Sequence, residues 1–454
     1  MKFKSFAGAS LLAVMVACAQ TGLAQAQSIT QALTAAYDHA PDLQIAVLDA
    51  KASAENIVQA KSRKLPTIGA SIGASQSYSL VGGNWSDSTS VTTGLSYNQT
   101  IFDNFQTEAQ IEAARAGAEA AEHQIRNTEQ NVLIQVVQAY MAVLTGNQLV
   151  SLRQENVNFF QAQLQSAQDR LDVGEGTRID VAQAQARLAQ GQAAYRASLA
   201  SLETSQATFQ RLVGQRPQGL SASHNYGNLI PRSLDSAISE AEIGHPAILL
   251  AKASIRAAQA GSDAASASFG PTASISGQVG SRWTPSGGGL TDGFSGSLGF
   301  QISIPIYAGG AIGSNIRQAN IQQIKSEVSA MSTYDQVREA VISAWSGIQA
   351  ADAQISAAQA AVTSSNTVLD GVIQERDLGT RTTLDVLNSQ ADLTSAQETL
   401  INASSNKVIA TFSLLSAMGR LTASDLGLPV TIKTAVPYTQ TVEDVWQELR
   451  TVAE

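Results

Sequence analysis

The sequence predicts a mixed helical and β-stranded membrane protein built from two internal repeats. Landmark residues recur at a constant offset of 205 positions, which separates Gly174 from Gly379 and Asp180 from Asp385. Each copy also holds two stretches in which apolar and small polar residues alternate, followed by a long proline-free stretch of helical character. An offset held over most of the chain indicates two copies of one structural unit without net insertion.

The composition suits long helices that pack through small side chains. Only 14% of the 454 residues are charged, against about 25% in an average soluble protein, and 44% are hydrophobic. The formal net charge is −9, and no basic stripe is present. This argues against a nucleic-acid partner, because neutralising phosphates requires clustered Lys and Arg.

The first residues predict a signal peptide over positions 1–26. Two lysines precede an apolar run over residues 6–17, and an A-x-A cleavage site ends at Ala26. Cys18, the only cysteine, lies inside this segment. It is either discarded with the signal or lipidated, since residues 15–18 loosely resemble a lipoprotein box. We favour the first alternative, which leaves the mature chain without a thiol or disulfide.

Repeat 1 is expected over 27–230, repeat 2 over 231–420, and a C-terminal segment at an equatorial waist over 421–454. Apolar residues alternate with small polar ones in four predicted strands, the period-two pattern of a strand with one apolar face. A polar loop over residues 82–88 is expected to turn the chain between the first two. The strands are predicted at about 67–80, 91–102, 272–283 and 294–307.

No helical stretch nearby is apolar enough to cover four such faces, and the opposite faces are too polar for the core of a β-sandwich. Apolar residues facing lipid and polar residues facing a lumen are typical of a transmembrane β-barrel. About eight strands are the practical minimum for closure. We therefore expect oligomerisation, with three copies supplying about twelve strands.

The helical stretches predict two long hairpins. A helix of roughly 69 residues would extend about 100 Å, and the shorter helices on either side of each strand pair together nearly match that length. The long helices are expected at about 104–173 and 310–378, and the return helices at about 177–213 and 382–418. Short helices are expected before the strands, at 41–64 and 246–269.

A turn with helix-capping residues joins the two helices of each hairpin. A glycine just past a helix end adopts the left-handed conformation without steric cost. A threonine three residues later can cap the next helix, and an aspartate three further on completes a capping box. These residues are Gly174, Thr177 and Asp180 in the first turn, and Gly379, Thr382 and Asp385 in the second.

With these features the chain resembles the TolC-type outer-membrane efflux and secretion channels over essentially its whole mature length. The duplicated plan carries the resemblance, together with the motif G-T-R-T-x-x-D-V-L at Gly379–Leu387. The resemblance implies a homotrimer, with a twelve-stranded barrel in the outer membrane of a Gram-negative bacterium continuing into a periplasmic helical barrel. It also implies a passive exit duct for a tripartite efflux pump or a type I secretion system. The implied partners are outer-membrane lipid, a periplasmic adaptor protein and an inner-membrane transporter of RND or ABC type.

The resemblance further implies an iris-like gate at the periplasmic tips. Asp385 matches a pore-lining aspartate ring, Arg381 an arginine of the closing links, and Asp180 its acidic partner. Two positions depart from the family pattern, since Asn388 replaces a second ring aspartate and Arg376 a latch tyrosine. The expected pore and gate residues are thus Asp385, Asn388, Arg381, Arg376, Asp180 and Arg178, and the turn residues expected at the adaptor are Gly174, Thr177, Gly379 and Thr382.

Simpler roles compete with these. The aspartates can act as helix caps alone, and the arginines as solvated charges. No enzyme, cofactor or metal site is expected, because His39, His123, His224 and His245 lack ligand spacing. The G-x-S-x-G match at residues 69–73 falls within a predicted strand, where a nucleophile elbow does not form. The alternative function is a secreted trimeric coiled-coil adhesin or structural fibre. The four lipid-patterned strands favour the duct, whose cargo (drugs, metals or proteins) stays open.

Overall fold

The computed structural model describes residues 27–221, 226–286 and 289–445. The predicted signal peptide with Cys18, and also His224, lie outside these residues. The described chain forms two compact units. We call residues 44–128, 244–336 and 433–445 the sheet unit, and residues 27–43, 129–243 and 337–432 the tip unit.

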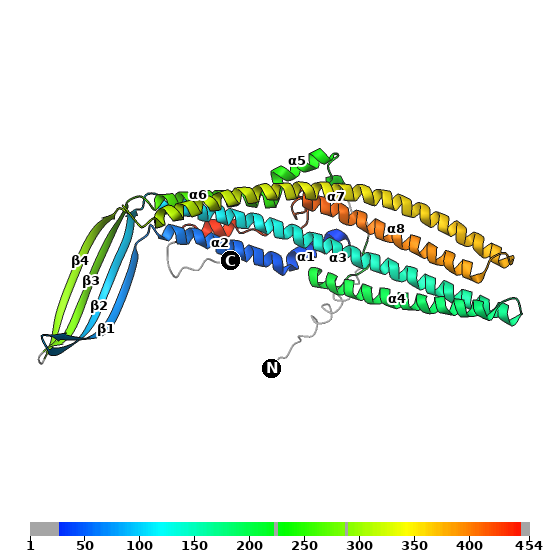
Figure 1. Ribbon diagram of the computed structural model, residues 1–454, viewed down its shortest axis with the longest axis horizontal. Coiled ribbons are helices and arrows are strands. Elements are labelled where there is room, and N and C mark those ends of the chain that lie inside the picture. The colour runs from blue at the N-terminus through cyan, green and yellow to red at the C-terminus, as the bar shows by residue number, and fades with distance from the viewer. Residues whose placement is uncertain (1–26, 222–225, 287–288, 446–454) are drawn as a thin grey trace, which may run out of the picture. The chain divides into compact units, whose positions relative to one another are not determined.

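The sheet unit contains one antiparallel sheet of four strands in the order β1-β2-β3-β4 (Figure 1). The β2–β3 pairing, from Val91 opposite Trp283 to Phe102 opposite Ala273, joins the two repeats. The apolar residues of the sheet are exposed to a high degree, with Ile72 at 84% and Leu298 at 83%. The strands are β1 (Thr67–Val81), β2 (Asn84–Phe102), β3 (Thr272–Ser286) and β4 (Gly289–Ser303).

Four strand boundaries differ from the sequence prediction by more than one residue, namely the start of β2, the end of β3 and both ends of β4. The expected loop over residues 82–88 is a turn of two glycines, Gly82 and Gly83, with φ of 63° and 85°, so that β2 begins earlier than residue 91. Positive φ at both central residues is what a type I′ hairpin turn requires. β4 ends at Ser303 rather than Tyr307, because Pro305 has no N–H to donate to a neighbouring strand.

A bulge near the end of β2 changes which residues face outward. Thr100 pairs with Ser274 and Phe102 with Ala273, so Ile101 is the extra residue. Residues directly opposite in an antiparallel pair lie on the same face of the sheet. Phe102 therefore shares the face of Ala273, which is the apolar face of β3.

The helices of the sheet unit are held together by ionic and polar contacts of the C-terminal segment. The Glu443 carboxylate accepts hydrogen bonds from Lys61 and Arg115, and these cations hold the pKa of Glu443 below its usual value, Arg115 most of all. The Glu122 carboxylate binds Thr434 Oγ1 and the Ala435 amide at the start of α9. The helices are α2 (Pro41–Ser62), α6 (Pro246–Ala267), α9 (Val436–Val442), and the first parts of α3 (Gln106–Asp172) and α7 (Ala311–Asp377).

The tip unit consists of helical hairpins with close helix–helix contacts. A Cβ at Gly191 of α4 would lie 3.0 Å from the Phe160 ring of α3, so glycine allows these helices to approach. Lys407 of α8 binds Asp352 of α7 at 2.7 Å. Figure 1 shows both hairpins ending in short turns. The unit contains α1 (Ile29–His39), α4 (Arg178–Val213), α5 (Leu234–Gly244), α8 (Thr383–Ala417), the 3-10 helix η1 (Tyr226–Leu229) and the remainder of α3 and α7.

The two strand-to-helix junctions have the same backbone geometry but different side chains. Before α7, Gly309 and Gly310 have φ of 60° and 87°, and before α3 the equivalent Asn104 and Phe105 have φ of 55° and 65°. Asn104 is held there by a 3.1 Å hydrogen bond from Nδ2 to the Ala267 carbonyl. A bulky side chain in the left-handed region costs about 1–2 kcal/mol, so Phe105 is a strained residue.

The register of β2 and β3 gives a first prediction. A Cβ at Gly280 would lie 2.5 Å from the Thr93 carbonyl oxygen, a backbone atom that cannot move independently of the strand. Gly280→Ala should therefore lower the free energy of unfolding in detergent by about 1–3 kcal/mol, measured as a shift of the urea midpoint. Gly277→Ala is the matched control on β3, since its nearest contact is 3.7 Å away. Equal midpoints for the two variants would contradict this register.

Candidate gate at the helical tips

The two hairpin turns are built in the same way from their own sequences. Gly174 and Gly379 adopt φ of 84° and 81°, which places them just past the ends of α3 and α7 as the sequence predicts. In the first turn the Gly176 amide donates to the Arg170 carbonyl at 2.9 Å, and in the second the Thr380 amide donates to the Glu375 carbonyl at 2.9 Å. These bonds satisfy carbonyls that the end of an α-helix leaves without a partner.

Both predicted capping boxes are present. The Asp180 amide donates to Thr177 Oγ1 at 3.2 Å, and the Thr177 amide donates to Asp180 Oδ2 at 3.1 Å. The Asp385 amide donates to Thr382 Oγ1 at 3.3 Å, and the Thr382 amide donates to Asp385 Oδ2 at 2.9 Å. The helix-cap roles of these residues are confirmed.

The second turn also holds a local ion pair. Arg381 Nε donates to Glu375 Oε2 at 2.8 Å, and the Glu375 carboxylate raises the pKa of Arg381. The Thr382 amide, then its hydroxyl, and to a lesser degree Arg381 lower the pKa of Asp385. The stabilising effect of the Asp385 cap is therefore present above the ordinary pKa of an aspartate, and it is lost as the pH falls through the lowered value.

Arg376 is a buried link between the two hairpins. Its side chain is only about 9% exposed in the chain. Nη1 donates to Gln163 Oε1 of α3 at 2.7 Å, and Nη2 donates to Asp377 Oδ1 at 2.7 Å. From the sequence, Arg376 could be a latch residue or a solvated charge, and its burial excludes the solvated charge.

A second link was missed from the sequence. Arg187 Nη2 of α4 donates to Asn388 Oδ1 of α8 at 2.8 Å. No motif marks Arg187, which lies two helical turns beyond Asp180, whereas the offset of 205 pairs Asn388 with Gln183 in the first repeat. Asn388 thus has a cation beside it.

The hairpins also share an apolar contact directly behind the turns. Val386 and Leu387, in the first turn of α8, are fully buried. Leu387 packs with Phe160 of α3 and Ala184 of α4, whereas Val386 packs with Leu369 of α7. The second hairpin is therefore attached to the first by apolar packing behind the turns and by the two arginine links near the tip, and farther from the tip by an ion pair of Arg153 in α3 with Glu398 in α8.

Not all expected gate residues meet one another in the described chain. Arg381 binds Glu375 of its own hairpin, and Asp180 binds Thr177 of its own cap. No contact joins Arg381 to Asp180 within residues 27–221, 226–286 and 289–445. Arg178 is exposed at the first position of α4. A pairing of Arg381 with Asp180 would thus need a hairpin of another copy.

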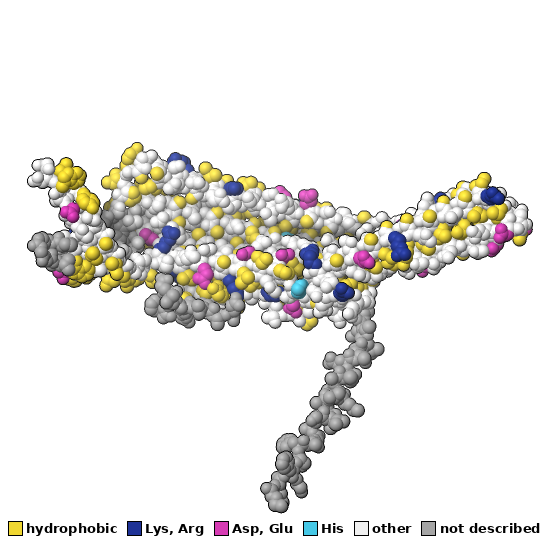
Figure 2. Space-filling model, turned by 90° about the horizontal axis from the view of Figure 1, so that it is seen from below, with side chains coloured by type: hydrophobic (Ala, Val, Ile, Leu, Met, Phe, Trp, Pro, Cys, Tyr) yellow, Lys and Arg dark blue, Asp and Glu magenta, His cyan; other side chains and the backbone are white. Residues whose placement is uncertain are grey.

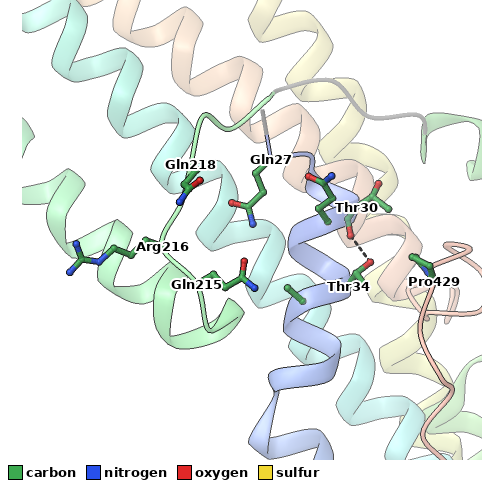
Figure 3. A pocket seen from close by; sticks show the side chains of 9 residues that line it. Gln27, Thr30, Thr34, Gln215, Arg216, Gln218 and Pro429 are labelled. Carbon is green, nitrogen blue, oxygen red and sulfur yellow. Dashed lines mark hydrogen bonds between the residues drawn. The ribbon is translucent and has the colours of Figure 1, made fainter. Parts of the chain in front are cut away.

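Away from the tips, one polar cavity of about 610 Å³ lies in the tip unit. In Figure 3 Gln27 and Gln215 point into it and Arg216 points away. Its lining offers amides and hydroxyls without a paired nucleophile and base. The nine lining residues are Gln27, Thr30, Gln31, Thr34, Ala35, Gln215, Arg216, Gln218 and Pro429.

On the face seen in Figure 2, charged side chains do not gather in one place. Figure 2 shows Lys and Arg side chains scattered over the face in view. In the part of the chain that the structure describes, no three His, Cys, Asp or Glu side chains gather as a metal site requires. The G-x-S-x-G residues 69–73 lie inside β1, as predicted, and His245 caps α6 through Nδ1, which accepts from the Ala247 amide at 3.1 Å.

Comparison with known proteins supports the same plan. The model of the outer membrane efflux protein family matches residues 29–215 and 237–420. The outer membrane efflux protein BepC of Brucella suis biovar 1 (strain 1330) is 37% identical over 448 residues, which span 98% of this chain and 96% of BepC. The outer membrane protein TolC of Escherichia coli (strain K12) is 27% identical, over 92% of this chain and 87% of TolC.

A solved structure shows the same fold at low sequence identity. The crystal structure of the Campylobacter jejuni CmeC outer membrane channel superposes with a TM-score of 0.75 at 16% identity, covering 92% of this chain and 89% of that one. The two family matches fall on the two repeats, and the BepC alignment spans nearly the whole chain. The chain belongs to the outer membrane efflux protein family and is a protein of the Gram-negative outer membrane.

Proposed function

We propose that three copies of this chain form a passive exit duct through the outer membrane, serving a tripartite efflux pump or a type I secretion system. The observation that carries the proposal is the sheet. Its four strands expose an apolar face, and its order leaves β1 and β4 each with one neighbour. Unpaired strand edges do not persist in hydrocarbon, where every backbone polar group needs a partner.

Closure by identical copies satisfies both edges. In the meander β1-β2-β3-β4 the first and last strands run in opposite directions, so β4 of one copy can pair antiparallel with β1 of the next. Three copies then form a closed barrel of about twelve strands. A secreted fibre would have no use for this apolar sheet, which makes the duct the better supported function.

The hairpin tips form the gate in this proposal. Asp385 lines the mouth, with Asn388 behind it, and Arg376, Arg381, Arg178 and Asp180 link neighbouring hairpins in the closed state. The turns with Gly174, Thr177, Gly379 and Thr382 present the surface for a periplasmic adaptor, which connects the duct to an inner-membrane transporter of RND or ABC type. The resemblance to channels such as TolC and BepC supports these roles.

Cysteine pairs across the two sheet edges test the proposal. Ser71 of β1 and Ser297 of β4 both lie on the polar face of the sheet. The chain has no other cysteine after Cys18. Three double variants combine Ser71→Cys with Ser295→Cys, Ser297→Cys or Ser303→Cys, and each tests one register between β1 of one copy and β4 of the next. One of the three should form disulfides between copies. The product is a ladder ending at a covalent trimer on denaturing gels.

Each single-cysteine variant is the control and should give no ladder. The disulfide-linked trimer should also insert into planar bilayers and conduct ions, as a duct must. A monomeric band in all three registers, from protein that is folded and extracted from outer membranes, would overturn the closed trimer.

A further inference from the structure

The junction between β2 and α3 has an exposed aromatic residue at a position where the second repeat has glycine. Phe105 is 66% exposed and lies in the left-handed region, as does Gly310. The backbone bonds are also the same, since the Ala109 amide donates to the Phe105 carbonyl and the Ser314 amide donates to the Gly310 carbonyl. The backbone geometry at this junction therefore does not need a side chain at Phe105, and most of the ring is open to a contact from outside the chain.

The neighbours of Phe105 place it on the apolar side of the sheet. Its ring meets that of Phe102 edge to face, with 5.9 Å between centroids and an angle of 80° between planes. The bulge at Ile101 puts Phe102 on the apolar face. Leu65, which precedes β1, is exposed at the same end of the sheet. In the proposed duct this end of the apolar face is the membrane boundary on the side of the helices.

A cavity of about 550 Å³ opens beside the Phe105 ring. It lies between the start of α3 and the end of α6 and holds two carboxylates. Asp263 is exposed, and its carboxylate has no ionic or hydrogen-bonding partner among the described residues. Glu108 pairs with Lys64, which brings a cation to the rim. The lining residues are Asn104, Phe105, Glu108, Ala109, Asp263, Ser266 and Ala267.

These groups match the three parts of one lipid class. An ammonium group with three N–H donors suits the carboxylates of Asp263 and Glu108. The adjacent phosphate suits Lys64 and the exposed guanidinium of Arg63, the preceding residue. The acyl chains suit an aromatic ring at the edge of the apolar sheet face. We propose that this cavity binds the headgroup of a phospholipid with a primary amine, of the phosphatidylethanolamine class, in the membrane leaflet on the side of the helices.

The second repeat lacks the site, which predicts one bound lipid per chain. The offset of 205 places Phe269 at the position of Lys64, Gly313 at that of Glu108 and Gly310 at that of Phe105. The cation of Lys64, the carboxylate of Glu108 and the ring of Phe105 thus have no counterparts at the equivalent positions. Phosphatidylcholine is the discriminating ligand, because its quaternary ammonium has no N–H to donate to the carboxylates.

Native mass spectrometry of delipidated full-length protein in detergent tests the inference. Added phosphatidylethanolamine should give up to one adduct per chain, at concentrations several-fold below those needed for phosphatidylcholine. Asp263→Asn should remove most of this preference. Phe105→Gly should weaken binding of both lipids, and it keeps the backbone geometry that Gly310 has. Asp87→Asn and Phe294→Ala, on parts of the sheet far from the cavity, are the matched controls and should bind as the unaltered chain does.

Equal binding of the two lipids, or an unchanged preference in Asp263→Asn, would overturn the inference. The inference rests on the proposed insertion of the sheet into the outer membrane, but the two fail differently. If the sheet is not inserted, the protein will give neither disulfide-linked trimers nor bilayer conductance. If only the lipid site is wrong, trimers and conductance will be intact and the adducts will show no preference for the primary amine.

Discussion

Arg376→Ala should raise the single-channel conductance of the duct in planar bilayers. The arginine is buried at the tip and donates to Gln163 of the other hairpin at 2.7 Å. Truncation leaves the Gln163 carbonyl oxygen without this donor and removes the Arg376–Gln163 link between the hairpins. Loss of such a buried hydrogen bond costs about 1–3 kcal/mol. If the closed state alone has the link, a loss of about 2 kcal/mol shifts the open–closed equilibrium about 30-fold.

Two variants distinguish a gate from general destabilisation. Gln163→Leu removes the acceptor and should raise the conductance in the same direction. Arg381→Ala removes an exposed arginine whose only described ionic partner, Glu375, lies in the same hairpin. In the proposed duct Arg381 pairs with a hairpin of another copy, so this variant should also raise the conductance, whereas Arg376→Ala and Gln163→Leu test the link within one chain. An unchanged conductance in Arg376→Ala and Gln163→Leu, with trimers still formed, would leave Arg376 as a packing residue only.

The strand pattern could be predicted because it depends only on which residues alternate. Where alternation is absent, the prediction is incomplete. Residues 84–90 have a single apolar side chain, Trp85, so nothing in the sequence separates a loop from a strand there. Their pairing with β1 comes from backbone hydrogen bonds that continue from the Gly82–Gly83 turn. The bulge at Ile101 could not be predicted either, because a single unpaired residue in a strand has no characteristic residue type here.

The tip shows the same division between local and distant contacts. Both capping boxes could be predicted, because each is closed by residues three positions apart. The Arg376–Gln163 and Arg187–Asn388 links join residues 213 and 201 positions apart. Such contacts depend on the rotational phase of long helices and on how the hairpins pack, and a small change in phase moves a side chain to another face.

The largest expected change in ion selectivity follows from Asp385. In the proposed trimer three such carboxylates surround the mouth, and two unit charges about 4 Å apart interact by about 1 kcal/mol in water, and by more at a lower dielectric constant. Asp385→Asn should therefore weaken block by a trivalent cation about tenfold or more and lower the preference for K⁺ over Cl⁻. The cap geometry is kept, because an asparagine oxygen can still accept from the Thr382 amide. Asp180→Asn changes the same capping box in the other repeat, and because the proposal places Asp180 in the links between hairpins and not at the mouth, it should leave the trivalent block unchanged.

The neighbouring position gives the sharpest form of this prediction. Asn388→Asp restores the second acidic residue of the family pattern, yet it places the new carboxylate against Arg187, which donates to Asn388 at 2.8 Å. The pair has no net charge, so the single variant should change trivalent block little. Asn388→Asp combined with Arg187→Gln frees the carboxylate and should strengthen the block about tenfold. If the trivalent cation blocks Asn388→Asp and the double variant equally, Arg187 does not compensate the charge of residue 388. If it blocks Asn388→Asp strongly but not the double variant, Asn388 lies nearer the axis than Arg187 can reach.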